Sequence, residues 1–115
     1  MGKGATIMPY IQEKRRDVLD NHINNSAEII KSNIGREYCK KSISQEELLS
    51  VCGDINYFVS RLINQVAGEI SYGKIAIISG VLDNIKQEFY RRIAEPYENK
   101  KINENGDIKE YKNAN

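Results

Sequence analysis

The sequence predicts a mostly α-helical protein built on an antiparallel hairpin of two long helices, with short helices at the N-terminal side. Three observations predict this fold. Apolar residues recur three and four residues apart along two long stretches. A Ser-Gln-Glu-Glu sequence opens the first stretch at Ser44, and Pro96 follows the second.

The first long helix is expected to begin at Ser44. Its hydroxyl can accept a hydrogen bond from the Glu47 amide while the Glu47 carboxylate reaches back, which is a capping box. Gly53 costs about 1 kcal/mol relative to alanine, so a break there, with Asp54 capping a second segment, is the alternative. We expect the helix to end near residues 68–70. Its apolar stripe consists of Leu48, Cys52, Ile55, Val59, Leu62 and Val66.

The second long helix is expected to follow a short connection at residues 71–73. Pro96 should end it, because proline lacks an amide hydrogen and clashes with the preceding turn. Two helices of about twenty residues with a short connection form an antiparallel hairpin, here from residues 44–70 and 72–95. The apolar stripe of the second helix consists of Ile75, Ile78, Leu82, Ile85, Phe89 and Ile93.

The two ends of the chain carry weaker patterns. Residues 11–19 and 23–34 predict two short helices, with Asp20 as the N-cap of the second and Gly35 as its stop. Residues 33–42 read as a polar loop. The predicted organisation is an N-terminal extension at residues 1–8, one helical domain at 9–99, and a polar tail or small hairpin at 100–115.

Composition limits the class of partner. The chain has 115 residues, and 17 Lys and Arg against 16 Asp and Glu give a formal charge of +1, which disfavours a dedicated binder of duplex nucleic acid. With 40% hydrophobic residues and no tryptophan, the core is thin. We therefore expect a homo-oligomer, a dimer or tetramer, to complete it. No signal peptide or membrane-spanning run is recognised, so the expected location is the cytoplasm.

Neither enzyme chemistry nor a metal site is expected. His22 is the only histidine, and no nucleophile elbow, P-loop or HExxH motif accompanies it. Cys39 and Cys52 form no CxxC pair and are expected to be thiols, with Cys52 buried and Cys39 exposed. We expect no cofactor.

One polar cluster at the end of the second helix suits a nucleotide. Arginine forks bind phosphate in a bidentate manner, and a tyrosine ring stacks on a base with about 1–3 kcal/mol. The alternative is that both arginines pair with Glu88 and Glu95 one turn away and favour the helix C-terminus. The cluster consists of Tyr90, Arg91, Arg92, Tyr97, Lys100 and Lys101.

A second cluster lies near the start of the first long helix. Asn56 and Ser60, and likewise Tyr57 and Arg61, are four residues apart and so share a helix face. An antiparallel hairpin brings this region near the end of the second helix, so the two clusters can share a cleft within one chain or across a dimer. Asn56 would then read a base edge. Otherwise Arg61 is a surface residue stacked on Tyr57.

The chain also resembles a family of short phage and prophage proteins without an assigned function. The similarity rests on Gly53-Asp54-Ile55-Asn56-Tyr57, Glu88-Phe89-Tyr90-Arg91-Arg92, Pro96-Tyr97-Glu98 and Asn105-Gly106-Asp107, and it extends from Met8 to Asp107. The chain departs from the family pattern at residues 35–51 and in the added residues 1–7.

The resemblance implies a phage role. Small helical phage proteins of this size include anti-CBASS sponges, which sequester cyclic-nucleotide immune signals without cleaving them. The expected function is therefore counter-defence by binding a cyclic dinucleotide or oligonucleotide. The alternatives are a small inhibitor or adaptor that binds a host protein, and a nucleic-acid accessory protein.

Overall fold

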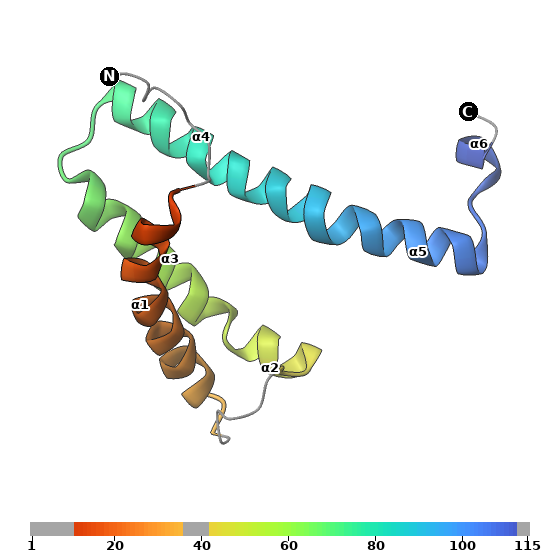
Figure 1. Cartoon of the computed structure of the whole chain (residues 1–115), viewed down its shortest axis with the longest axis horizontal. Coiled ribbons are helices and arrows are strands. Elements are labelled where there is room, and N and C mark those ends of the chain that lie inside the picture. The colour runs from red at the N-terminus through yellow and green to blue at the C-terminus, as the bar shows by residue number, and fades with distance from the viewer. Residues whose placement is uncertain (1–10, 36–41, 113–115) are drawn as a thin grey trace. The chain divides into compact units, whose positions relative to one another are not determined.

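The computed structural model describes residues 11–35 and 42–112, which hold helices and no strand (Figure 1). The predicted mostly α-helical class is confirmed. The described residues divide into two units, one within residues 11–71 and one at 72–112. Because each unit is described by itself, the antiparallel hairpin, which would join one unit to the other, stays a prediction.

The first unit opens with a single helix, α1 (Glu13–Ser32), where the sequence analysis predicted two short ones. The expected cap at Asp20 is wrong, because apolar spacing continues through it from Leu19 to Ile23 and an aspartate inside a helix costs only a fraction of a kcal/mol. The predicted stop is confirmed: the chain leaves α1 through Gly35, whose φ of 78° is one that glycine adopts without strain.

The predicted capping box is confirmed at the start of α2 (Gln45–Ser50). The Glu47 amide donates to Ser44 Oγ over 3.1 Å, and the Ser44 amide donates to Glu47 Oε1 over 2.8 Å. These bonds satisfy two amides that the first turn of a helix otherwise leaves without partners.

The first long helix is broken, as the alternative proposed, but the break falls at Val51 and not at Gly53. Val51 has φ −110° and ψ 10°, and α3 (Cys52–Ala67) starts directly after it. The Val51 side chain is 1% exposed, so the residue at the bend is buried.

Cys52 is exposed, which corrects the expected burial. Val51 takes the inner position, and in a helix the side chain of the following residue points about 100° away from it. Cys39 lies outside the described residues.

A side-chain hydrogen bond ties α1 to α3. Asn33 Nδ2 donates to Asp54 Oδ2 over 3.1 Å across 21 residues of chain. Asp54 thus accepts from the residue that follows α1 and does not cap its own helix, while its charge still suits the first turn of α3. The helix ends at Gly68, φ 69°, as predicted.

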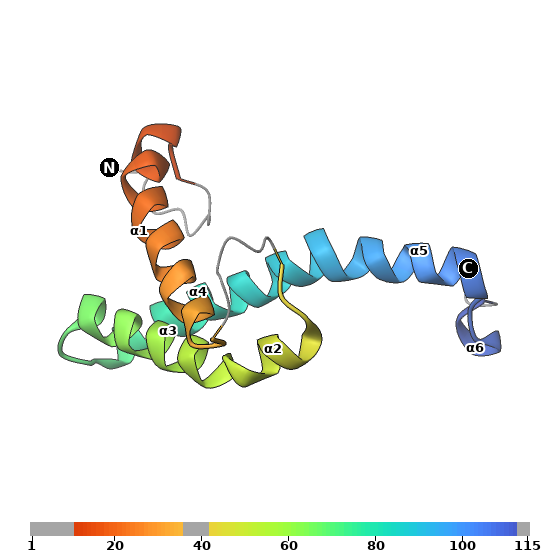
Figure 2. The ribbon, with the colours of Figure 1, turned by 90° about the horizontal axis from the view of Figure 1, so that it is seen from below.

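The second unit is dominated by one continuous helical run of 34 residues (Figure 2). It consists of α4 (Tyr72–Phe89), the π-helical turn η1 (Tyr90–Ala94) and α5 (Glu95–Asn105). The predicted end at Pro96 is wrong. The Glu95 amide donates five residues back to the Tyr90 carbonyl, so the hydrogen-bond register shifts just before the proline. Pro96 then occupies the first turn of α5, where no amide is required.

Two stretches of the segment predicted as a polar tail or small hairpin are helical. Residues up to Asn105 continue α5, where Lys101 Nζ lies 3.4 Å from Glu104 Oε1 one turn on. The turn expected at residues 105–107 is present, since Gly106 has φ 86°, and α6 (Lys109–Lys112) follows it.

Few hydrophobic side chains are fully buried within the described residues. Val51 is the one buried hydrophobic residue there, while Ile85, Phe89 and Ile93 are 55%, 63% and 56% exposed. A long helix whose apolar stripe faces water gains little of the burial that stabilises folded proteins. In this part of the chain, no helix has both the length and the apolarity needed to cross a membrane.

The capping box generates a stability prediction. Ser44→Ala removes the acceptor of the Glu47 amide and should lower the free energy of unfolding by about 1 kcal/mol. Chemical denaturation followed by circular dichroism measures this loss. Ser42→Ala, a change at an exposed serine two residues earlier, is the control. Equal stabilities of the two variants would contradict the role of the cap.

The proline generates a second prediction. Pro96→Ala restores an amide donor inside the long helix and should raise the thermal midpoint and the helical signal, because an interior proline costs about 3 kcal/mol relative to alanine before any relief. Because the register shift at η1 already removes part of this cost, the gain in stability should be smaller than about 3 kcal/mol. A thermal midpoint below that of the unmodified chain would contradict the prediction and show that Pro96 stabilises the π-turn.

Candidate functional site

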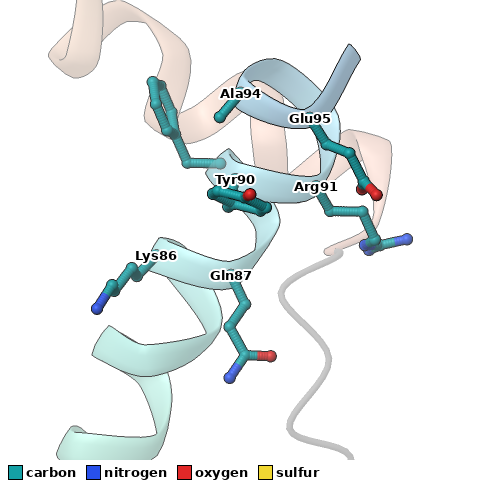
Figure 3. Close-up of a pocket in the computed structure, with 7 residues that line it drawn as sticks. Lys86, Gln87, Tyr90, Arg91, Ala94 and Glu95 are labelled. Atoms are coloured by element: carbon teal, nitrogen blue, oxygen red, sulfur yellow. The ribbon is translucent and has the colours of Figure 1, made fainter. Parts of the chain in front are cut away.

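An open hollow of about 560 Å³ lies along the junction of α4, η1 and α5 (Figure 3). In Figure 3 the side chains of Arg91 and Glu95 lie on one edge, Lys86 lies on the other, and the Tyr90 ring stands between them. The volume of the hollow falls within the range of small-molecule sites. The π-helical turn η1 is also relevant, because such turns frequently occur at functional sites. The lining residues are Lys86, Gln87, Phe89, Tyr90, Arg91, Ala94 and Glu95.

Two arginines share one carboxylate beside this hollow. Arg91 Nη2 pairs with Glu88 Oε1, and Arg92 Nη1 lies 3.9 Å from Glu88 Oε2. The arginine side chains are 63% exposed, while Glu88 is 23% exposed. The predicted pairing with Glu88 is therefore confirmed. One negative charge against two positive charges leaves the group cationic.

The Tyr90 hydroxyl is held by a residue of the next helix. It donates to Glu98 Oε1 over 3.1 Å. This hydrogen bond raises the pKa of Tyr90 above its ordinary value of 10.0, and the negative charges of Glu98 and Glu95 raise it further. The environment of Tyr90 therefore favours the neutral phenol over the phenolate.

The remaining predicted residues of this cluster lie outside the hollow. Lys101 Nζ stands 5.5 Å from the centre of the Tyr97 ring, a cation–π contact that covers one face of that ring. Tyr97, Lys100 and Lys101 belong to α5 and are not lining residues. The structure thus brings Tyr90 and Arg91 together, with Arg92 joined through Glu88.

The second predicted cluster lies on α3, in the first unit. Ser60 Oγ donates to Asn56 Oδ1 over 3.4 Å, which confirms that these two residues share a helix face. Tyr57 is 65% exposed. The cleft that Asn56, Tyr57 and Arg61 were expected to share with Tyr90 would join both units, and it stays a prediction.

Several residues of the site were missed by the sequence analysis. Lys86 was visible as a cation one turn before Tyr90, and Glu95 lies one turn after Arg91. Glu98 was not detectable, because its alignment with Tyr90 depends on η1. Among the described residues, no cluster of His, Cys, Asp or Glu is arranged to hold a metal ion.

One comparison places the chain in a family. A family model described as Domain of unknown function (DUF6899) matches residues 8–108, and the chain belongs to this family. The match includes α1 to α5 and therefore the hollow. No curated protein and no solved structure matches the chain.

The Tyr90–Glu98 bond predicts a pH dependence. Since the folded chain raises the pKa of Tyr90, the stabilisation is complete below pH 10 and is lost as the pH rises through the raised value. The thermal midpoint should therefore fall more steeply above about pH 10 than it does in Tyr90→Phe. Tyr72→Phe, at a tyrosine that is 93% exposed, should behave as the unmodified chain. Equal alkaline declines in all three proteins would contradict the bond.

Proposed function

We propose that this member of the DUF6899 family binds a cyclic dinucleotide or cyclic oligonucleotide signal and sequesters it intact, as a phage counter-defence protein in the host cytoplasm. The observation that supports the proposal best is the hollow at the centre of the long helix, where a tyrosine ring and an arginine line the same wall. A ring for the base and a guanidinium for the phosphate are the two elements that nucleotide binding needs.

The hollow and its neighbours carry charges of both signs. Lys86, Arg91 and Arg92 carry three positive charges, and the carboxylates of Glu88, Glu95 and Glu98 carry three negative charges, so the group is close to neutral. A phosphodiester has one negative charge, whereas a terminal phosphate has up to two. A cyclic nucleotide carries its charge as separate single-charged phosphodiesters, whereas a triphosphate concentrates several charges on adjacent groups, so a wall with so little excess positive charge favours the cyclic nucleotide.

The chemistry of the wall supports binding without cleavage. The Tyr90 hydroxyl is a neutral phenol that donates its proton to Glu98, so it is not poised as a nucleophile. The only histidine of the chain, His22, lies in α1. Sequestration needs affinity alone, for which a ring and a guanidinium are sufficient.

The exposed apolar stripes support a homo-oligomer, a dimer or tetramer. A chain that buries one hydrophobic residue within its described part needs a further surface to cover Phe89 and Ile93. Another copy of the chain would also close the hollow, whose lining residues all come from one helix. Asn56, Tyr57, Arg61, Tyr97, Lys100 and Lys101 would supply the remaining contacts to the ligand.

The same exposed stripes favour a second candidate, a small inhibitor or adaptor of a host protein. Tyrosine and arginine are enriched at interface hot spots, so the cluster at Tyr90 and Arg91 is compatible with that role. The two candidates differ in their ligand, which a titration distinguishes. A nucleic-acid accessory protein would instead show an affinity that falls steeply with salt.

The test is a calorimetric titration of the full chain with cyclic dinucleotides, cyclic trinucleotides and adenosine triphosphate, followed by mass spectrometry of the ligand. We expect binding of at least one cyclic nucleotide, recovered intact, and much weaker binding of the triphosphate. Absence of binding to every cyclic nucleotide would overturn the proposal. Conversion of the ligand would make the protein an enzyme.

Two variants locate the site. Arg91→Ala and Tyr90→Ala should each weaken binding at least tenfold while leaving the circular dichroism spectrum unchanged, since both side chains are more than half exposed. Arg16→Ala, at an exposed arginine of α1, is the matched control and should bind as the unmodified chain. A loss in Arg16→Ala as large as the loss in Arg91→Ala would show that the overall charge of the chain, not the hollow, determines the affinity.

A further inference from the structure

Among the described aromatic residues that line the hollow, Tyr90 alone has a hydroxyl group, and that hydroxyl is bound to a residue outside the hollow. Its hydroxyl donates to Glu98 Oε1 over 3.1 Å, and Glu98 lies in α5 beyond the lining residues. Phe89, the other aromatic lining residue, has no polar atom through which it can be fixed. The anchor therefore distinguishes Tyr90 from its neighbour.

The π-turn makes this anchor possible. Tyr90 and Glu98 are eight residues apart, and in a regular α-helix that spacing rotates the second side chain by about 80° from the first. The π-turn η1 absorbs one residue, as the bond from the Glu95 amide to the Tyr90 carbonyl shows. The pair then behaves as residues seven apart, which lie on one face two turns from each other.

An anchored ring matters because the tyrosine is exposed. Tyr90 is 52% exposed, so without its hydroxyl partner the side chain can move between rotamers in water. A base that stacks on a mobile side chain must first immobilise it, and that ordering weakens binding. A ring held before the ligand arrives removes this cost, which is the general advantage of a preorganised site.

We propose that Glu98 is a positioning residue of the hollow, which holds Tyr90 through its hydroxyl so that the side chain stays in one position, where its ring can stack on the base of a nucleotide. The inference rests on the proposed function for its ligand. The anchor itself exists in the free protein and can be measured there.

The first measurement therefore needs no ligand. In the full chain with ¹³C-labelled tyrosine, the ring signal of Tyr90 is identified by its loss in Tyr90→Phe. Glu98→Gln keeps an oxygen acceptor but removes the charge, so the ring should stay ordered while its pKa falls toward 10.0. Glu98→Ala should lower the pKa and also give a ring signal averaged by motion. A Tyr90 signal that is identical in the unmodified chain and in Glu98→Ala would overturn the inference, whatever the protein binds.

The second measurement uses cyclic di-AMP and cyclic di-GMP as probes in calorimetric titrations. Glu98→Ala and Tyr90→Phe should each weaken binding about fivefold, the effect of one exposed hydrogen bond, and the double variant should be no weaker than either. Glu98→Gln should restore the affinity to within about twofold. Glu110→Ala, at an exposed carboxylate of α6, is the control.

Other results separate two failures. Additive losses in the double variant, or full affinity in Glu98→Ala, would overturn the positioning role while leaving nucleotide binding intact. If the unmodified chain binds neither probe nor any other cyclic nucleotide, the proposed function fails, and the ring signals alone then decide whether Glu98 holds Tyr90.

Discussion

The register shift at η1 is the constraint on which the long helix depends. A proline inside a helix ordinarily ends it, because one amide is missing and the ring meets the carbonyl of the preceding turn. Here the Glu95 amide, directly before Pro96, donates a hydrogen bond to the Tyr90 carbonyl five residues back. Helical structure then continues through the proline to Asn105. The hollow and the Tyr90–Glu98 bond both lie around this shift, so a single irregularity determines the position of the candidate site.

The first unit is organised by a second local feature, the bend at Val51. The capping box starts α2, the bend ends it, and α3 begins again with its first turn joined to α1 through Asn33 and Asp54. The capping box joins residues close together in the sequence, and the contact between α1 and α3 is a single hydrogen bond between two polar side chains. The apolar stripe of α3 in this unit remains exposed, and so does that of α4 in the second unit, so each unit has apolar surface that a second copy of the chain could cover.

The sequence contained enough information for the helical class and for those ends that have a local chemical signature. Ser44 and Glu47, and Gly35, Gly68 and Gly106, act through bonds or φ values within a few residues, so their effects could be predicted. The continuation through Pro96 could not be predicted, because it depends on a change of hydrogen-bond register that no apolar spacing reports. For the site, the predicted Tyr90 and Arg91 do line the hollow. Glu98 escaped prediction for the same reason as the continued helix.

The position of η1 also has a consequence for motion. A long helix usually frays from its ends and persists longest in the middle. In the run from Tyr72 to Asn105, however, the irregular turn and the proline lie in the middle, so the backbone there should open on a shorter timescale than the flanking turns. A molecule bound in the hollow would contact both sides of that weak point. It would then stabilise the helix across the irregular turn, and amide hydrogen exchange at residues 90–95 would become slower when it binds.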